Sequence, residues 1–300
     1  MKVKFNSNGK LLLSGEYLVL KGAKSLSIPT KFSQTLEVSN NTSGKLIWKS
    51  YDQNKKIWFD LNFDLQNEWN LKSFKENKLL FKTLSAIKRK NPESFSKGVS
   101  FKTKMDFNRN WGFGSSSSLI NNLASWANYD KFKLYWKVTN GSGFDLASSS
   151  CNKPILYKLY KKNPEFKQVN FNPTFKNNLY FIYLGEKQNT YNEILNFNKL
   201  KIEEKSILKV SSITDDILNC DSFEDFKSLI KEHERIVSQV LKRETVKDLY
   251  FKDYSGEIKS LGAWGGDFIL AAGDQNSKTY FNNLGYNVVF TFDELIKKAD

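Results

Sequence analysis

The chain has 300 residues, of which 40% are hydrophobic and 26% are charged, so it has enough apolar material for packed cores and is not a predominantly disordered chain. This length exceeds the usual size of one hydrophobic core, so we predict two domains, residues 1–172 and 173–300. The formal net charge is +14, but the lysines are scattered, which favours a general compositional bias over a nucleic-acid surface. We therefore expect no nucleic-acid partner, and RNA binding stays as a less favoured alternative.

The first third of the chain alternates between apolar and polar residues, which predicts short β-strands. The predicted strands are 2–5, 9–20, 35–38, 46–48 and 57–61. Apolar residues at helical spacing predict a helix over 74–89, and alternation returns over 98–107.

A second helix is predicted over 119–127, because serines suited to an N-cap precede apolar positions at helical spacing. Residues 190–250 have mainly helical periodicity, and a polar stretch over 163–178 is typical of a connection. Further strands are predicted over 155–159, 179–184, 268–272 and 288–292. Together these patterns predict an α+β fold class.

The cysteines and the histidine exclude several kinds of catalytic site. Cys151 and Cys220 are too few for a disulfide framework and lack the spacing of metal ligands. His233 is the only histidine and lies in the charged stretch 231–235, so we expect a solvated helix residue there. Mechanisms that need a Ser-His-Asp triad, a Cys-His pair or a cluster of histidines on a metal are therefore disfavoured.

No apolar run is long enough to cross a membrane, because even 11–20 is interrupted by Ser14, Gly15 and Glu16. The same interruption argues against a signal peptide. We expect a soluble, cytoplasmic protein without a membrane partner, which is a monomer or a homodimer.

Glycine-rich segments lie beside apolar runs at 9–22, at 110–118 with 141–150, and at 259–273. Glycine lets backbone N–H groups approach an anion, and a helix that begins at such a loop adds the positive end of its dipole. The Walker pattern G-x-x-x-x-G-K-[ST] and a G-x-G-x-x-G that opens a βαβ unit are both missing from the sequence. The sequence favours a phosphate site of another kind, with an ordinary capped loop as the alternative for 110–118.

The order of these segments resembles that of the GHMP kinases, the family of galactokinase, homoserine kinase, mevalonate kinase and phosphomevalonate kinase. Residues 8–22 (NGKLLLSGEYLVLKG) resemble the first family motif, and residues 110–118 resemble its Gly-Leu-Gly-Ser-Ser phosphate loop. Residues 141–148 resemble the Ser-Gly-x-Asp segment of the catalytic aspartate, and residues 259–268 resemble the third, glycine-rich motif. The resemblance spans nearly the whole chain.

The resemblance implies a fold and a reaction. It implies an N-terminal α/β domain like the second domain of ribosomal protein S5 and a ferredoxin-like C-terminal domain, with ATP and substrate in the cleft between them. The implied activity is a phosphotransferase that uses ATP and Mg²⁺ on a small-molecule acceptor. Such a reaction requires an in-line acceptor oxygen and neutralisation of the γ-phosphate, with little covalent chemistry from the protein.

The resemblance also assigns roles residue by residue. Asp145 is implied to be the catalytic base, Lys10 its electrostatic partner, and Ser116 a ligand of Mg²⁺. The implied nucleotide-binding residues are Asn110, Trp111, Gly112, Phe113, Gly114, Ser115, Ser116 and Ser117. The implied acceptor-side residues are Glu16, Tyr17, Ser142, Gly143, Gly262, Ala263, Gly265, Gly266 and Asp267. Without the resemblance, Asp145 has a helix N-cap role as its alternative.

The chain departs from the family pattern at three places, of which Trp264 and the stretch 131–139 keep a second function open. Phe113 replaces the usual leucine, Trp264 stands where glycine is common, and 131–139 lacks the metal-binding glutamate of mevalonate-kinase-like members. A GHMP-fold binding or regulatory protein with impaired catalysis is therefore the alternative.

Two motifs favour different acceptors. Gly265-Gly266-Asp267 resembles the third motif of phosphomevalonate kinases, whereas the Ser-Gly-x-Asp pattern and the compact length resemble bacterial mevalonate kinases. We expect mevalonate or phosphomevalonate as the acceptor, in isoprenoid precursor synthesis.

Overall fold

The structure is a computed structural model and describes residues 2–185 and 190–298. Its contacts divide the chain into two compact units. Unit 1 comprises Met1–Gly9, Phe32–Arg109 and Gly114–Ser150, and unit 2 comprises Lys10–Lys31, Asn110–Phe113 and Cys151–Asp300. The units are defined by contacts alone, and the domain limits expected from the sequence stay a prediction.

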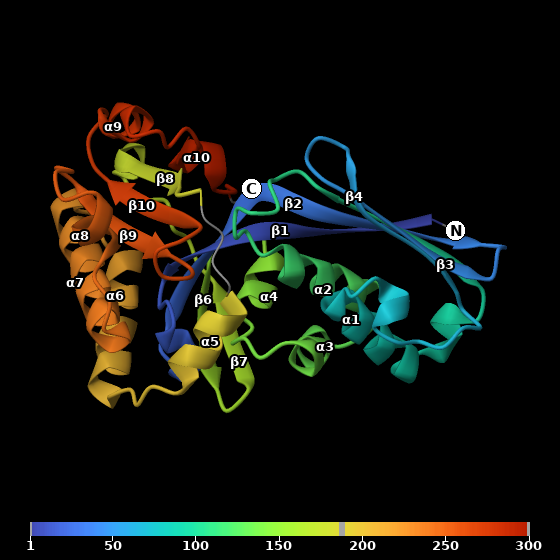
Figure 1. The fold of residues 1–300 in the computed structure, drawn as a ribbon. Coiled ribbons are helices and arrows are strands. Elements are labelled where there is room, and N and C mark those ends of the chain that lie inside the picture. Colours follow the sequence, from blue (N-terminus) through green and yellow to red (C-terminus); the bar gives the residue numbers. More distant parts are fainter. Residues whose placement is uncertain (1, 186–189, 299–300) are drawn as a thin grey trace. The chain divides into compact units, whose positions relative to one another are not determined.

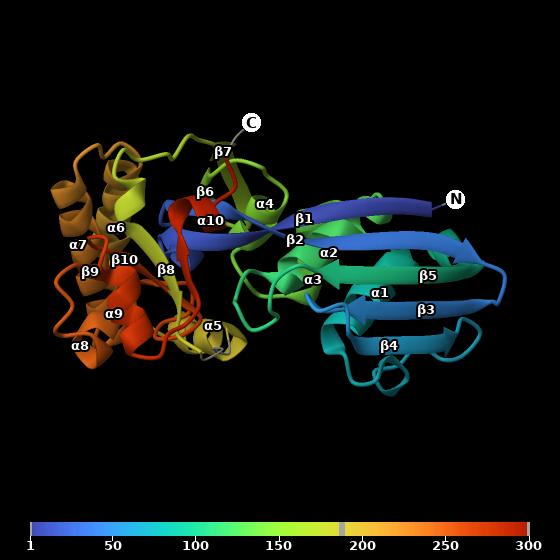
Figure 2. The same ribbon diagram turned by 90° about the horizontal axis from the view of Figure 1, so that it is seen from above.

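Unit 1 is a sheet with helices on one face (Figure 1; Figure 2). The strand order is β4 (Ile57–Asp64), β3 (Lys45–Tyr51), β5 (Gly98–Met105) and β2 (Ser25–Asn41), and β1 (Lys2–Ser14) pairs with β2. Strands β3 and β5 are parallel, whereas β3–β4 and β2–β5 are antiparallel. The helices are α1 (Lys78–Lys90), α2 (Ser115–Trp126), α3 (Lys131–Val138) and α4 (Phe144–Ser149). Strands β1 and β2 also contribute residues to unit 2.

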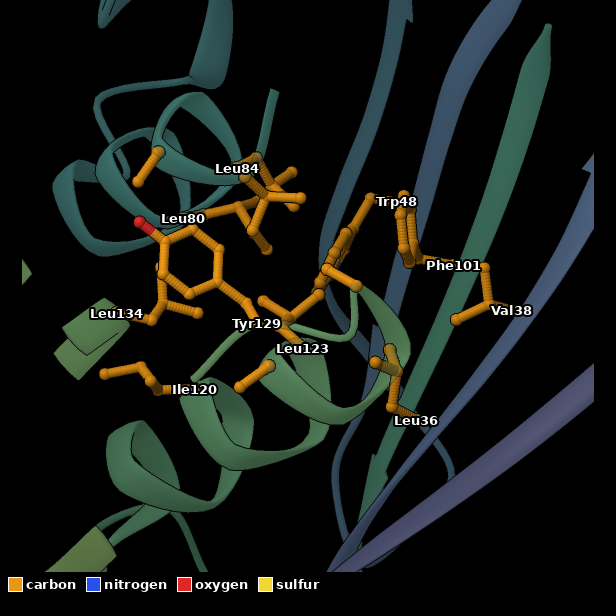
Figure 3. Packing of buried hydrophobic residues seen from close by; sticks show 14 of the residues in the cluster. Leu36, Val38, Trp48, Leu80, Leu84, Phe101, Ile120, Leu123, Tyr129 and Leu134 are labelled. Carbon is orange, nitrogen blue, oxygen red and sulfur yellow. The ribbon is translucent and has the colours of Figure 1, made fainter. Parts of the chain in front are cut away.

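The core of unit 1 lies between the sheet and these helices (Figure 3). Trp48 of β3 packs against Phe101 of β5 with ring centroids 4.9 Å apart. Leu84 of α1 and Leu123 of α2 belong to the same buried cluster. Burying such a side chain contributes about 1.5–3 kcal/mol, so this layer is what fixes α2 on the sheet.

Unit 2 contains an antiparallel sheet in the order β11 (Val289–Thr291), β8 (Leu179–Tyr183), β10 (Phe268–Ala272) and β9 (Glu257–Leu261). Helix α7 (Phe223–Leu241) packs against β9, and α6 (Glu204–Leu218) packs against α7 (Figure 1). The remaining elements are β6 (Ile155–Tyr160), β7 (Asn163–Gln168), α5 (Thr190–Asn198), α8 (Val246–Tyr250), α9 (Ser277–Asn283) and α10 (Phe292–Leu295). Residues Ser25–Ser27 of β2 pair with β6, which pairs with β7.

Two expectations on secondary structure are wrong. The strand predicted over 9–20 ends at Ser14, because Gly15 has φ +96° and a 3₁₀ helix follows at Leu18–Lys21. The stretch 163–178 is not only a connection, since it contains β7, which is antiparallel to β6. Over residues 2–185 and 190–298, no helix combines the length and the apolar character needed to cross a membrane.

Candidate active site

Lys10, in β1, contacts the start of the second glycine-rich segment. Its Nζ donates a hydrogen bond to the carbonyl oxygen of Gly112 at 3.1 Å, and its backbone N–H donates to the carbonyl oxygen of Phe113 at 3.0 Å. All three residues belong to unit 2. The first and second motifs are therefore joined both through the backbone and through the lysine side chain.

The third motif meets the second at the same place. Gly112 has φ +64°, and a Cβ added to it would lie only 2.3 Å from Oδ2 of Asp267. Only glycine fits this position, because it adopts a positive φ without strain and has no side chain to collide with Asp267. Asp267 is buried and has a positive φ of its own, +52°. Lys10, Gly112 and Asp267 thus bring three segments of the sequence together within unit 2.

Aromatic packing anchors this part of the second motif. Phe113 stacks on Phe268 of β10 at 5.0 Å, and Trp111 packs edge-on against Phe290 of β11 at 5.3 Å. Both contacts lie in unit 2. The replacement of leucine by Phe113 is therefore accommodated by a neighbouring aromatic ring, since aromatic pairs of this kind stabilise beyond their buried area.

The rest of the second motif, in unit 1, begins helix α2. Gly114 has φ +82° and occupies the N-cap position. The hydroxyl of Ser117 donates to the carbonyl oxygen of Gly114 at 2.8 Å, and that of Ser118 donates to Oε1 of Gln34 at 2.6 Å. Ser116, in contrast, is exposed. The helix N-terminus carries partial positive charge, and Ser116 is the serine of this turn that faces solvent.

Asp145 lies half-buried in the first turn of α4, which belongs to unit 1. The N-cap is Gly143, with φ +90°, so the N-cap alternative for Asp145 is wrong. Its Oδ1 accepts a hydrogen bond from the hydroxyl of Tyr135 and another from the N–H of Leu146, each at 3.0 Å. These two donors fix the orientation of the carboxylate.

Two small residues support this arrangement. Gly141 abuts the Tyr135 hydroxyl, which would lie 2.3 Å from an added Cβ. Ser142 is buried and precedes Gly143, the N-cap of α4. A close approach of backbone to Tyr135 is thus built into the segment that carries Asp145.

Glu16 and Tyr17 are both buried in unit 2, at 1% and 8% exposure. The Glu16 carboxylate lies 2.6 Å from Nζ of Lys259, at the start of the third motif. The Tyr17 hydroxyl accepts a hydrogen bond from the N–H of Trp264 at 2.8 Å. Both side chains therefore tie the first motif to the third.

Two further ionisable residues, His233 and Glu234 of α7, complete this buried cluster. Lys259 Nζ lies 3.7 Å from Oε1 of Glu234, and His233 Nε2 lies 3.3 Å from Oε2 of Glu16. The expectation that His233 is solvated is wrong, since its side chain is 0% exposed. Its Nε2 accepts a hydrogen bond from the N–H of Gly15 at 3.0 Å, which assigns the proton of the neutral ring to Nδ1.

Burial determines the protonation of this cluster. It raises the pKa of Glu16 and raises the pKa of Glu234 to about 7, while the positive charge of Lys259 acts against both shifts. Burial, with the same lysine, lowers the pKa of His233 well below its ordinary value. At neutral pH the histidine is therefore uncharged.

The third glycine-rich loop uses some of its own amides internally. Gly262 and Gly265 have φ values of +86° and +74°, and a Cβ on either would have no heavy atom within 4 Å. The N–H of Gly266 donates to the carbonyl oxygen of Ala263, and the N–H of Trp264 donates to Tyr17. These two amides are consequently committed to protein acceptors in this conformation.

No family model and no curated protein matches the sequence, but solved structures match over nearly its whole length. The mevalonate kinase of Methanococcus jannaschii has 15% identity and a TM-score of 0.72, with 100% of this chain and 99% of that chain covered. The phosphomevalonate kinase of Streptococcus pneumoniae, in complex with phosphomevalonate and AMPPNP, has 18% identity and a TM-score of 0.72, covering 96% and 99%. The galactokinase of Lactococcus lactis, complexed with galactose, has 13% identity and a TM-score of 0.65, covering 97% and 92%.

The chain has the GHMP kinase fold. The resemblance seen in the motifs and the α+β fold class are thereby confirmed at the level of the fold. The three similar proteins are named for three different acceptors, so the GHMP kinase fold by itself does not choose among them.

A nucleotide-bound magnesium ion is compatible with the donors that this GHMP kinase fold presents. Within the described residues, no three side chains of His, Cys, Asp or Glu gather into a group that could hold a metal ion. Mg²⁺ is commonly bound by one or two protein oxygens together with substrate phosphates and water. An exposed hydroxyl such as that of Ser116 suits that mode, whereas a cage made wholly of protein groups is not present in the described part of the chain.

Sequence reasoning missed Tyr135, His233, Glu234 and Lys259 as parts of these sites. His233 could have been found, because Phe226, Ile230, His233 and Val237 follow helical spacing and are all buried on α7. The charged neighbours of His233 in the sequence concealed this pattern.

Proposed function

We propose that this protein is an ATP-dependent kinase that transfers the γ-phosphoryl group to a hydroxyl of a small acceptor, with mevalonate or phosphomevalonate as the expected acceptor. The observation that carries the proposal is the convergence of Lys10, Gly112 and Asp267, from three separate motifs, within unit 2. A positive side chain beside a glycine-rich segment is what binding of a polyphosphate requires.

In the proposed reaction the acceptor oxygen attacks the γ-phosphorus, the bond from that phosphorus to the β–γ bridging oxygen breaks, and ADP leaves. The acceptor proton passes to the carboxylate of Asp145. Tyr135 and Leu146 both donate to Oδ1, so we assign proton acceptance to Oδ2.

Lys10 and the N-terminus of α2 supply positive charge for the phosphates in this proposal. Mg²⁺, when bound with the nucleotide, would neutralise charge on the phosphate oxygens, and Ser116 is the residue that would hold it. The arrangement agrees with chemistry in which the protein mainly positions groups and stabilises charge.

The test is an ADP-release assay with Mg-ATP and, in turn, mevalonate, phosphomevalonate, homoserine and galactose. We expect turnover of one acceptor, and Asp145→Asn should lower kcat by about 10²–10⁴-fold, the usual contribution of a general base. Asp106→Asn is the matched control, because this carboxylate of unit 1 also accepts one N–H and one O–H hydrogen bond, both from Ser33. The control should keep the activity.

The other outcomes are equally informative. Full turnover by Asp145→Asn would reject Asp145 as the base. If no acceptor leads to ADP release but AMPPNP binds measurably, the expected acceptors are rejected and a kinase with another acceptor remains. Silence without nucleotide binding would reject the kinase proposal in favour of a binding or regulatory protein.

A further inference from the structure

Tyr17 occupies a strained turn directly after the first motif's strand. Its φ and ψ are +60° and −50°, and the N–H of Leu18 donates to the carbonyl oxygen of Glu16 at 2.6 Å. This is a γ-turn whose central residue has positive φ, a rare conformation for a residue with a side chain. Such strain persists only where the surroundings hold it in place.

The surroundings of the Tyr17 side chain are well defined. Its ring packs on Phe197 of α5 with centroids 5.4 Å apart. Its hydroxyl donates to Oε2 of Glu193 at 2.9 Å, and Glu193 also accepts hydrogen bonds from Arg243. Burial, together with the Glu193 carboxylate, raises the pKa of the hydroxyl. The hydroxyl therefore stays protonated and donates its hydrogen bond to Glu193.

Because its proton goes to Glu193, the hydroxyl oxygen is available as an acceptor, and the N–H of Trp264 fills that role. Trp264 is held a second time, since its indole Nε1 donates to the carbonyl oxygen of Glu244 at 2.9 Å. Trp264 stands between Gly262 and Gly265, the two glycines of this loop with positive φ. No heavy atom lies within 4 Å of a Cβ added at either glycine, so the loop is loosely packed there. The Tyr17–Trp264 hydrogen bond restrains the loop between these two positions.

We infer that Tyr17 is a positioning residue for the loop 262–267: its hydroxyl fixes the Trp264 backbone and so holds Asp267 against Gly112. The inference rests on the proposed function for its catalytic consequence. Tyr17 was expected to contact the acceptor. In this inference it instead holds the loop 262–267, whose residues were expected to contact the acceptor. The inference also explains the presence of Trp264 in a glycine-rich motif. The backbone N–H of Trp264 binds Tyr17 and its indole N–H binds Glu244, so the loop is held by two hydrogen bonds.

The experiment compares the full-length wild type with Tyr17→Phe, which keeps the ring and removes the hydroxyl. The exchange rate of the Trp264 amide is followed by hydrogen–deuterium exchange with residue-level fragmentation. We expect exchange about fivefold faster in Tyr17→Phe, in line with the loss of one hydrogen bond. Tyr254→Phe is the matched control, because this tyrosine is 5% exposed, belongs to unit 2 and has its hydroxyl bonded to Ser277 at 2.7 Å. The control should leave the Trp264 amide unchanged.

Unchanged exchange of the Trp264 amide in Tyr17→Phe would overturn the inference. Should Tyr17→Phe fail to fold, Glu193→Gln tests the same chain of hydrogen bonds and should also accelerate exchange of that amide. In the double variant, exchange should be no faster than in Tyr17→Phe alone, because both changes act on one path. Additive acceleration would contradict a shared path.

The kinetic arm separates this inference from the proposed function. With the acceptor that the wild type uses, Tyr17→Phe should raise KM for the acceptor about fivefold. Faster exchange with an unchanged KM would reject a role in acceptor binding. Faster exchange in a protein that neither transfers phosphate nor binds AMPPNP would reject the kinase proposal while the positioning of the loop by Tyr17 stands.

Discussion

Lys259 Nζ and Glu16 Oε1 lie 2.6 Å apart, and the two side chains are 0% and 1% exposed. The pair joins β9 to the turn that follows β1, and it lies beside a second carboxylate, that of Glu234. Because both charged groups are buried away from water, removing either partner leaves the other as an uncompensated buried charge. The three groups therefore form a buried charge cluster that holds the first and third motifs of unit 2 in register.

Replacing Lys259 by methionine should strongly destabilise the protein. The substitution leaves Glu16 and Glu234 buried without their cation, and breaking a buried pair in this way costs about 3–5 kcal/mol of unfolding free energy. Urea-induced unfolding measures the loss. The double variant Glu16→Gln/Lys259→Met should recover part of it, because no unpaired charge of that pair remains.

Lys24→Met is the matched control. Lys24 forms its ion pair with Asp215 at the surface of unit 2, where the two side chains are 34% and 42% exposed. Exposed pairs contribute about 0–1 kcal/mol, so this change should be mild. Equal losses for Lys24→Met and Lys259→Met would contradict the special role of burial.

Stability should depend on pH through Glu234. Its folded-state pKa of about 7 lies above the ordinary value of 4.5, so the folded protein binds a proton that the unfolded chain has already lost. The stabilising contribution is full below pH 4.5 and is lost as pH rises to about 7, on the order of 3 kcal/mol in all. Glu234→Gln removes this dependence, so its Tm should gain on that of the wild type as pH rises across this window.

Glu232→Gln controls for the neighbouring position on α7. Glu232 is paired with Arg235, whose hydrogen bond lowers the pKa of the carboxyl. Its contribution is present above the ordinary pKa and is lost only as pH falls below it. Between pH 5 and pH 8, roughly, the Tm difference from wild type should therefore stay constant. A slope like that of Glu234→Gln would mean that burial of Glu234 is not the cause.

Gly112→Ala should impair the proposed reaction by about tenfold or more in kcat/KM, the effect of a misplaced group worth about 1.4 kcal/mol. The added Cβ would lie 2.3 Å from Asp267 Oδ2, so the carboxylate must move. Gly44→Ala is the control, since Gly44 has a similar φ of +69° but nothing within 4 Å of an added Cβ. The free energy of unfolding should fall by about 1 kcal/mol in both variants, because alanine is strained at a positive φ. Activity should fall in Gly112→Ala alone.

Ser116→Ala should weaken the use of Mg-ATP with little change in Tm, because this exposed hydroxyl has its role in the bound nucleotide complex. Ser117→Ala should instead lower stability by about 1 kcal/mol, since its buried hydroxyl donates to the carbonyl oxygen of Gly114. Titration of ATP at fixed Mg²⁺, together with thermal unfolding, separates the two. Identical behaviour of the two variants would refute Ser116 as the serine that serves the metal.

The fold could be predicted because the glycine-rich motifs resemble those of the GHMP kinases, and several of their glycines are required by the backbone. Gly112, Gly114, Gly143, Gly262 and Gly265 all have positive φ, so their spacing marks turns that other residues rarely form. The helices α1 and α7 were also predictable, since their apolar residues recur every three or four positions on a buried face.

The partners of those motifs were not predictable in the same way. His233 and Glu234 lie on a buried face of α7, but charged residues usually face water, and burial here depends on Lys259 of another element. The γ-turn at Tyr17 has no composition signal, because its conformation is held by Glu193 and Trp264, which are distant in sequence. Long-range partners of this kind determine a conformation that local propensity disfavours.

The contact between Tyr17 and Trp264 spans 247 positions of the chain, and this has a consequence for synthesis. Residues 11–13 of β1 are buried by at least 96% in the finished protein, yet most of unit 2 follows residue 150. A ribosome adds about 5–20 residues per second, so this apolar segment waits on the order of ten seconds or more for the elements of unit 2 that follow. During that interval the nascent chain presents this strand without its neighbours from beyond residue 150, and a chaperone that binds short apolar segments would find a target at residues 11–13.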